Sequence, residues 1–413
     1  MTLRPAPGTR GYTAAIVMAQ MLAQIGGFAL PALLPTYMAR WTLSATEAGW
    51  LVGAFFAAYV VMVPILLALT DRYPARYVYL FGTGLTALSH LGFALVAGGF
   101  WSALIFRILA GAGWAATYMP GLKIIADPLE GVAQSRVVSW HALGVGVSNA
   151  ASFAIAGWIA ALAGPEAAFL VGAAAAASAF LIAALVVPGA PPKHTAPLRT
   201  LLDYRPVFRN RPAMAWIAGY TVHTWEMAVL RAWGVTFFAT AIAWHGAPEW
   251  LPTPTTLFTF AGFVGVAVSI SGNEAAQRFG RLRVVVLAMS VAAVLSVFAG
   301  WSAAVSSTLA VLVVIVWNAA IYLDSAALTA GTVAAADKER RGATMGLHSM
   351  CGYAGGFVGP PLAGFVLDLA GRDRLLGWGL AFGHLAVITL VGLAVLLWFA
   401  RPRRAAAPAA AAS

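Results

Sequence analysis

Four ionisable side chains lie inside long apolar stretches of this 413-residue chain: Arg107, Glu226, Arg231 and Asp324. A charge within hydrocarbon is costly unless it is paired or reaches water, so such residues commonly mark proton relays, substrate sites or buried ion pairs. We therefore take these four as the first candidates for function. The two arginines could offset the charge of an anionic solute, and the two acids could carry protons.

The richest of these stretches surrounds Glu226. His223 lies three residues earlier, which places both side chains on one face of an ideal helix, whereas Arg231 lies five residues later and points elsewhere unless the helix is broken. Burial favours the neutral form of a carboxyl group and a nearby cation favours its charged form, so the pair could take up and release a proton. We predict that Glu226 carries a proton beside His223; the alternatives are a polar bridge that joins two helices and a position near the membrane surface.

Asp324 is the second candidate acid and lies between Tyr322 and Ser325. It could titrate, pair with an arginine or reach water. His141 and His348 could face a central cavity, or they could be hydrogen-bonded packing residues. Further polar and aromatic residues are candidates for lining that cavity: Gln20, Gln24, Tyr118, Asn149, Tyr220, Asn318 and Tyr322.

The composition indicates which elements position these residues. The chain is 61% hydrophobic and only 9% charged, whereas about 25% of residues are charged in soluble domains. A helix of about 20 apolar residues crosses a bilayer. The sequence predicts an all-α membrane protein with twelve transmembrane helices, at about 12–35, 44–69, 77–98, 100–124, 137–163, 166–188, 213–243, 254–275, 284–302, 305–331, 343–367 and 376–400.

Two helix starts carry clear local signals. Ser44 and Glu47 have the spacing of a capping box, and Thr253 before Pro254 predicts an N-cap followed by a first-turn proline. The stretch at 12–35 is longer than the apolar region of a secretion signal, so we expect it to be retained as a helix.

The basic residues indicate the orientation of the chain. Placing both termini in the cytoplasm leaves only Arg40, Arg372 and Arg374 outside, and the other Lys and Arg residues beyond the spans fall inside. The net charge of +11 therefore reflects membrane topology and not nucleic-acid binding. We expect a multi-pass protein of a bacterial-type inner membrane with both ends in the cytoplasm. The single cysteine, Cys351, excludes an internal disulfide framework, and we expect neither a metal site nor a cofactor.

The chain divides into two comparable halves. Residues 189–212 are rich in proline and arginine, which predicts a cytoplasmic linker between a six-helix bundle at 1–188 and another at 213–400; the Ala-rich tail at 401–413 is expected to be disordered. His141 and Gly157 precede His348 and Gly364 by one common interval. These matches predict an internal repeat of the kind found in transporters.

Two motifs resemble the major facilitator superfamily of secondary transporters. The loop after the second span keeps the Asp71, Arg72 and Arg76 of the family's loop signature, although Leu67, Pro74 and Ala75 replace its other characteristic residues. Its counterpart in the second half contains Arg278, Gly280 and Arg281, and the fourth span carries Arg107 followed by Gly111 and Gly113. Charges at helix ends can form contacts in one conformation and break them in another, so we expect Asp71 and Arg72 to act in gating. For Arg76 and Arg281, a solvated loop is the simpler interpretation.

The resemblance implies two six-helix bundles that expose a central site alternately to each side of the membrane, with Arg107 in proton coupling or substrate contact. The fifth span lacks the proline of the family's antiporter signature, which disfavours export. We therefore expect proton-coupled uptake of a small organic anion by a monomer, with proton-driven efflux of amphiphilic compounds as the alternative. Two further alternatives are an intramembrane metalloenzyme that uses His141, His348 and Asp324, and a sensor that transports nothing.

Overall fold

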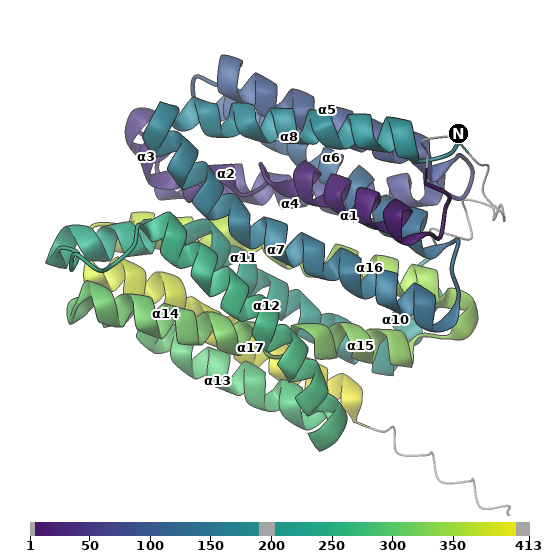
Figure 1. Ribbon diagram of the computed structural model, residues 1–413. Coiled ribbons are helices and arrows are strands. Elements are labelled where there is room, and N and C mark those ends of the chain that lie inside the picture. Colours follow the sequence, from purple (N-terminus) through teal and green to yellow (C-terminus); the bar gives the residue numbers. More distant parts are fainter. Residues whose placement is uncertain (1–4, 190–202, 402–413) are drawn as a thin grey trace, which may run out of the picture.

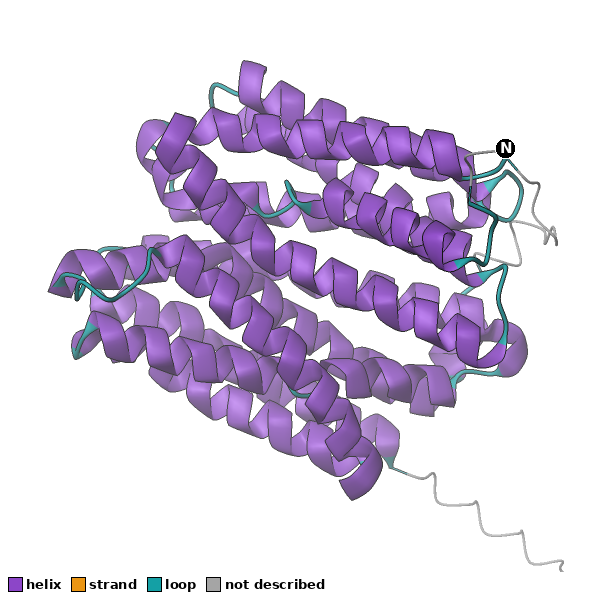
Figure 2. Ribbon diagram, viewed as in Figure 1, coloured by secondary structure: helices purple, strands orange, loops and turns teal. Residues whose placement is uncertain are grey.

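The computed structural model describes residues 5–189 and 203–401, and every regular element in these two ranges is a helix (Figure 2). The first half of the chain forms α1 (Arg10–Gln24), α2 (Ala29–Ala32), α3 (Leu34–Arg40), α4 (Ala45–Leu69), α5 (Ala75–Val96), α6 (Phe100–Ala126), α7 (Gly131–Ala163) and α8 (Pro165–Val186). The second half forms α10 (Arg205–Arg209), α11 (Arg211–His245), α12 (Pro254–Phe279), α13 (Arg281–Trp301), α14 (Ser307–Tyr322), α15 (Ser325–Ala335), α16 (Arg341–Ala370) and α17 (Leu375–Ala400), with 3-10 turns at Ser302–Ala304 and Lys338–Arg340. The expected all-α membrane fold is confirmed: in the described ranges, 11 helices are long and apolar enough to cross a membrane.

The predicted first span is not one helix. It breaks after Gln24, and α1, α2 and α3 follow one another across the molecule (Figure 1). Gly26, at the break, packs closely on His90: a Cβ atom there would lie 2.5 Å from Nε2 of the histidine. The backbone at this point lacks its full set of helical hydrogen bonds, and Arg107 supplies one of the replacements through the carbonyl oxygen of Gly27. The first crossing is therefore made by a discontinuous helix.

The predicted tenth span is also interrupted. α14 ends at Tyr322 and α15 begins at Ser325, so Asp324 lies at the junction. The carbonyl group of Leu323 packs directly on Gly272 of α12, where a side chain would overlap it. Discontinuous helices of transporters often carry binding sites, because their free backbone groups are tolerated only where protein or water satisfies them.

Both predicted helix starts are confirmed. Ser44 and Glu47 form a complete capping box at the start of α4, and the Thr253 side chain accepts a hydrogen bond from the backbone of Thr256 at the start of α12. Within the predicted linker a short helix, α10, forms, and α11 begins at Arg211, where Asn210 caps it. Residues 190–202 of the linker and 402–413 of the tail lie outside the described residues.

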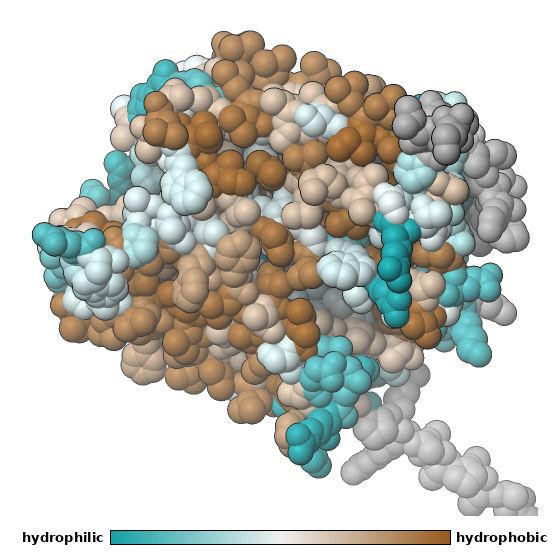
Figure 3. Space-filling model, in the orientation of Figure 1, coloured by the Kyte–Doolittle hydropathy of each residue, from teal (hydrophilic) through white to brown (hydrophobic). Residues whose placement is uncertain are grey.

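The surface matches a protein surrounded by lipid. Figure 3 shows an apolar band between two more hydrophilic ends of the molecule. Large apolar side chains are exposed, among them Leu162 at 84% and Leu369 at 72%. Isolated exposed apolar residues are normal in soluble proteins, but this many on long apolar helices indicate contact with hydrocarbon. We call the end of the molecule where α1 begins and α17 ends the terminal face, and the other end the opposite face.

The two halves meet at the opposite face through two equivalent helix crossings. Gly157 of α7 packs against Thr255 at the start of α12, and Gly364 of α16 packs against Ala45 at the start of α4. A Cβ atom on either glycine would overlap its neighbour, so both crossings depend on the absence of a side chain. The equal spacing of these glycines in the sequence thus corresponds to equivalent contacts between the halves.

A carboxylate from one half holds a helix start of the other. Asp368 of α16 accepts hydrogen bonds from the backbone nitrogens of Ala45 and Thr46, both at 2.8 Å, and from the Thr46 hydroxyl at 2.6 Å. A negative charge at a helix N-terminus satisfies free N–H groups and interacts favourably with the helix dipole. We call this contact the Asp368 clasp.

Replacing Asp368 with asparagine is expected to favour conformations that open the opposite face. Loss of a helix cap costs about 0.5–2 kcal/mol, which corresponds to roughly a tenfold rise in the open population. Spin labels on Trp101 and Trp250, which are exposed on different halves, would report longer distances in the variant. Asp373→Asn is the matched control, because Asp373 is 90% exposed on the loop that follows α16. Equal distances in both variants would contradict the role of the clasp.

Candidate functional site

A positive charge lies at the seam between the two halves. Arg231 of α11 donates a hydrogen bond through Nη2 to the Tyr322 hydroxyl at 2.5 Å, and its guanidinium carbon lies 5.0 Å from the centre of the Phe28 ring. With Asn149 and Asn318 it lines a cavity of about 40 Å³. No carboxylate in the described ranges forms an ion pair with this arginine. The cavity therefore presents a partly buried cation without a counter-ion.

The nearby acid is paired with a histidine from another helix. Nδ1 of His223 lies 2.9 Å from Oδ1 of Asp324, and both side chains are almost completely buried. The same nitrogen lies 3.0 Å from the carbonyl oxygen of Ile321. Asp324 follows Tyr322 by two residues, so the His223–Asp324 pair and the Arg231–Tyr322 contact join α11 to the same α14–α15 junction.

The predicted pairing of His223 with Glu226 is wrong. Glu226 instead accepts a hydrogen bond from the Thr389 hydroxyl of α17 at 2.7 Å, within the second half. Residues three apart on a helix point about 60° from each other, so they can face different neighbouring helices. Here His223 faces α14 and Glu226 faces α17, which gives Glu226 the geometry of a polar bridge between helices.

Aromatic and hydroxyl groups extend the His223 pair along the second half. The Tyr220 ring stacks on His348 with 3.8 Å between ring centres and lies 5.7 Å from His223. His348 also lies 3.0 Å from the Thr332 hydroxyl through Nδ1. His348 is thus a hydrogen-bonded packing residue that contacts the histidine–aspartate pair through Tyr220.

Four rings close the middle of the seam. Tyr353 of α16 lies 5.8 Å from Phe56, 4.4 Å from Tyr59 and 5.6 Å from Trp114, measured between ring centres. The Tyr59 hydroxyl also lies 3.1 Å from the Ser349 hydroxyl across the seam. We call Phe56, Tyr59, Trp114 and Tyr353 the aromatic plug.

Beyond the plug, the seam widens toward the terminal face. A cavity of about 360 Å³ lies between α4 and α6 of the first half and α10 and α16 of the second, lined among others by Asp71, Tyr204, Arg340 and Ser349. The opposite face is closed by the glycine crossings. The chain is therefore in a conformation that is open between the halves at one face only.

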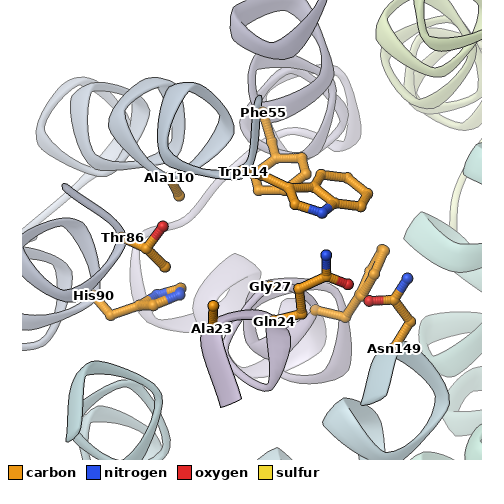
Figure 4. Close-up of a pocket in the computed structure, with 10 residues that line it drawn as sticks. Ala23, Gln24, Gly27, Phe55, Thr86, His90, Ala110, Trp114 and Asn149 are labelled. Carbon is orange, nitrogen blue, oxygen red and sulfur yellow. The ribbon is translucent and has the colours of Figure 1, made fainter. Parts of the chain in front are cut away.

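A second polar cavity lies within the first half, beside the break between α1 and α2. It has a volume of about 10 Å³, and Gln24, His90 and Trp114 line it together with Asn149. Figure 4 shows the Gln24 amide between the indole nitrogen of Trp114 and the amide of Asn149. Both amide atoms of Gln24, Nε1 of Trp114 and Nε2 of His90 are buried without a hydrogen-bond partner among the described residues.

Arg107 lies deeper in the first half and is 2% exposed. Its Nε donates to the carbonyl oxygen of Leu51 at 3.2 Å, its Nη1 donates to that of Gly27 at 3.3 Å, and its guanidinium carbon lies 4.8 Å from the Phe55 ring centre. These contacts join α6, α4 and the break that follows α1. This geometry favours a structural clasp over the expected contact with substrate.

An Arg107→Lys variant is expected to unfold at a lower temperature and to transport with nearly unchanged affinity. Lysine keeps the charge but cannot bridge two carbonyl groups as the guanidinium fork does, and each lost charged hydrogen bond costs about 1.5–3 kcal/mol. Thermal unfolding of the purified protein and KM for uptake would be measured together. A large rise in KM at unchanged stability would indicate a substrate contact instead.

The predicted gating residues do not bridge the halves in this conformation. Asp71 forms an ion pair with Lys123 of α6, so both partners belong to the first half. Arg76 donates to the carbonyl oxygens of Ala184 and Val187 at 2.7 and 2.6 Å, where it holds the end of α8. Asp71 nevertheless lines the 360 Å³ cavity, so it remains placed for a contact that forms when this cavity closes.

The remaining loop arginines show no contact between the halves among the described residues. Arg72 is exposed, Arg278 lies over the ring of Phe279 at 5.3 Å, and Nε of Arg281 is buried without a hydrogen-bond partner there. Their role in gating remains a prediction.

Besides Gln24, Tyr220 and His348, three more of the predicted cavity residues do not line the Arg231 cavity: Gln20, Tyr118 and His141. Gln20 packs against Gly121 and Tyr79 inside the first half. The His141 ring lies 5.6 Å from Tyr118, and its Nε2 has no hydrogen-bond partner in the described part of the chain. Within the same ranges, no three His, Cys, Asp or Glu side chains form a group that could hold a metal ion.

Several contacting residues were not among the sequence-derived candidates. Thr389, Lys123 and Asp368 are ordinary residues at helix ends or in apolar runs, and only their partners on other helices give them a role. His90 and Trp114 also lie in apolar spans without a local partner. The break after α1 could have been found from the sequence through the Gly26–Gly27 pair, because adjacent glycines inside a helical pattern commonly mark a break.

Comparisons with known proteins agree with the fold. A family model described as Major Facilitator Superfamily matches residues 16–322 and 228–413. A nucleoside transporter, NupG, has 15% identity and a TM-score of 0.76, with 94% of this chain and 100% of that chain covered. A bacterial homologue of the human lysosomal transporter Spinster has 15% identity and a TM-score of 0.77, with 96% and 97% covered.

A transporter of the POT family, solved with a thioalcohol-conjugated peptide, has 11% identity and a TM-score of 0.78, with 96% of this chain and 99% of that chain covered. At such identities the likeness concerns the fold alone. No curated protein sequence matches the chain. The family match spans most of the sequence, and the chain therefore belongs to the Major Facilitator Superfamily and is a membrane transporter.

Proposed function

We propose that this transporter imports a small organic anion together with protons. The observation that carries the proposal is the unpaired guanidinium of Arg231 in a cavity between the halves, where Asn149 and Asn318 add amide groups. A partly buried cation without a counter-ion is costly, and a carboxylate that enters the cavity would reduce that cost through charged hydrogen bonds.

The His223–Asp324 pair supplies the proton site in this proposal. Its acid lies two residues from Tyr322, whose hydroxyl contacts Arg231. A shift of the α14–α15 junction on anion binding would therefore move Asp324 relative to His223 and change its access to water. Burial favours the neutral acid and water favours the charged one, so such a shift couples anion and proton binding.

The orientation follows from the basic loops. The terminal face corresponds to the cytoplasm, so the conformation described here is open toward the cytoplasm. We assign the protein to a bacterial-type inner membrane with both termini cytoplasmic. The two halves enclose the site within one chain, so a monomer suffices for transport.

Uptake into proteoliposomes tests this function. Vesicles with an acidic exterior would be given radiolabelled short-chain carboxylates, and accumulation is expected that a protonophore abolishes. An imposed gradient of two pH units supports about 100-fold accumulation per proton for a monovalent anion, because each unit provides about tenfold. Equal uptake with and without the gradient would contradict proton coupling.

Efflux of amphiphilic compounds is the rival function, and the aromatic plug supports it. The clustered rings at the seam could bind a flat apolar compound. Vesicles loaded with a fluorescent amphiphilic cation would distinguish the two functions. If the protein is an anion importer, the pH gradient is expected to leave the release of this cation unchanged.

A further inference from the structure

The Arg231 cavity and the Gln24 cavity are neighbours. Asn149 lines both of them. Phe28 lines the Gln24 cavity, and its ring centre lies 5.0 Å from the Arg231 guanidinium carbon and 6.4 Å from the Trp114 ring centre. The Phe28 ring therefore lies between the Arg231 guanidinium and the Gln24 cavity, stacked on Phe153, which lines the Arg231 cavity.

The two cavities differ in chemistry. The Arg231 cavity offers a positive charge and matches a carboxylate. The Gln24 cavity offers an amide oxygen that accepts, an amide nitrogen and an indole nitrogen that donate, and an imidazole nitrogen, and none of these atoms has a hydrogen-bond partner among the described residues. Buried polar groups are normally satisfied, so a ligand group that both donates and accepts would complete this set.

The separating residue lies where the backbone is free to adjust. Phe28 follows the break after α1, and its backbone nitrogen donates to the Ser152 hydroxyl of α7 at 3.2 Å. A displacement of the Phe28 side chain would give up its stacking on Phe153 at 5.5 Å and its ring contacts with Trp114 and Arg231, and would leave the hydrogen bonds of α1 intact. Both cavities could then join into one elongated site.

We infer that the transported anion has two polar ends, a carboxylate for Arg231 and an uncharged hydroxyl or carboxamide group for Gln24. This inference rests on the proposed anion import and adds a requirement to it. A site built to hydrogen-bond a polar group discriminates strongly against an analogue that lacks the group, because its own buried atoms then remain unpaired.

Two pairs of analogues of equal length test the inference. Succinamate and 4-oxopentanoate differ only in a terminal amide nitrogen in place of a methyl group, and 4-hydroxybutyrate and pentanoate differ only in a hydroxyl in place of a methyl group. Thermal stabilisation of the purified protein reports binding without requiring transport. We expect succinamate and 4-hydroxybutyrate to stabilise the wild type at concentrations about 10-fold or more below those of their partners.

A Gln24→Leu variant is expected to reduce this preference to about twofold, because leucine offers the polar end of the ligand no hydrogen bond. Gln20→Leu is the matched control, because Gln20 is a buried glutamine of the same helix that packs against Gly121 and Tyr79, and it should keep the preference. The wild-type comparison alone remains decisive if Gln24→Leu does not fold.

The outcomes separate this inference from the function on which it rests. Equal stabilisation by both members of each pair would overturn the two-ended site, show that only water satisfies Gln24, and leave the Arg231 anion site standing. Absence of stabilisation by all four carboxylates would overturn both. An unchanged preference in Gln24→Leu would place the polar end of the ligand elsewhere and overturn the inference.

Discussion

An Asp324→Asn variant is expected to exchange labelled for unlabelled solute but to lose proton-driven accumulation. Asparagine preserves the shape of the side chain and can still contact His223, yet it cannot release or take up a proton. Under a gradient of two pH units, accumulation should fall from about 100-fold to about one, because a carrier without a proton site only equilibrates its solute. Accumulation and exchange would be measured in the same proteoliposomes.

Glu226→Gln is the matched variant for this experiment. Glu226 is as deeply buried as Asp324, but its partner is the Thr389 hydroxyl of α17, and glutamine can keep that hydrogen bond. We therefore expect Glu226→Gln to accumulate solute close to the wild-type level. The reverse result, with coupling lost in Glu226→Gln and kept in Asp324→Asn, would identify Glu226 as the proton carrier.

An Arg231→Gln variant is expected to lose affinity for the anion. Removing one partner of a buried charge pair typically costs about 2–5 kcal/mol, so KM should rise by roughly 30-fold or more. Glutamine retains a donor for the Tyr322 hydroxyl, which limits structural damage. KM and the maximal rate of carboxylate uptake would be determined with the unfolding temperature as a check on folding.

Asn318→Ala is a useful comparison for Arg231. Asn318 lines the same cavity, but its amide nitrogen donates to the Ala261 carbonyl oxygen at 2.7 Å and it carries no charge. Its replacement should raise KM far less than Arg231→Gln. Equal effects of the two substitutions would mean that the cavity recognises shape or polarity and not negative charge.

Much of the fold could be predicted because it depends on local physics. Span length and apolar composition indicate the long helices, the Ser44–Glu47 spacing produces the capping box, and Thr253 with Pro254 starts α12. The common interval of Gly157 and Gly364 corresponds to equivalent crossings, because the same close contact is needed in each half.

The site was less predictable because its contacts lie between helices. His223 and Glu226 share a helix face, and sequence spacing could not show that α14 and α17 offer each of them a different partner. The break at Asp324 depends on Gly272 of α12, far away in the sequence. Arg107, Arg231 and Asp324 were nevertheless identified, because the cost of burying a charge is visible in the sequence itself.

The two helix crossings at the opposite face are held by hydrogen bonds of unequal strength. Asp368 holds the α4–α16 crossing with a carboxylate, whereas Ala161 follows Gly157 at the corresponding distance in α7. In the described part of the chain, the α7–α12 crossing is joined by the uncharged hydroxyl of Thr259, which donates to the Ala150 carbonyl oxygen at 3.0 Å and accepts from the Ala154 backbone nitrogen at 2.8 Å. Hydrogen bonds to charged groups contribute about 1.5–3 kcal/mol, against about 0.5–1.5 kcal/mol for neutral ones.

We therefore expect the two halves to separate first along α7 and α12. The α4–α16 crossing would then act as the hinge about which the halves rotate. Because α7 and α12 also line the Arg231 cavity, the first gap to open would lead an arriving solute directly to the guanidinium.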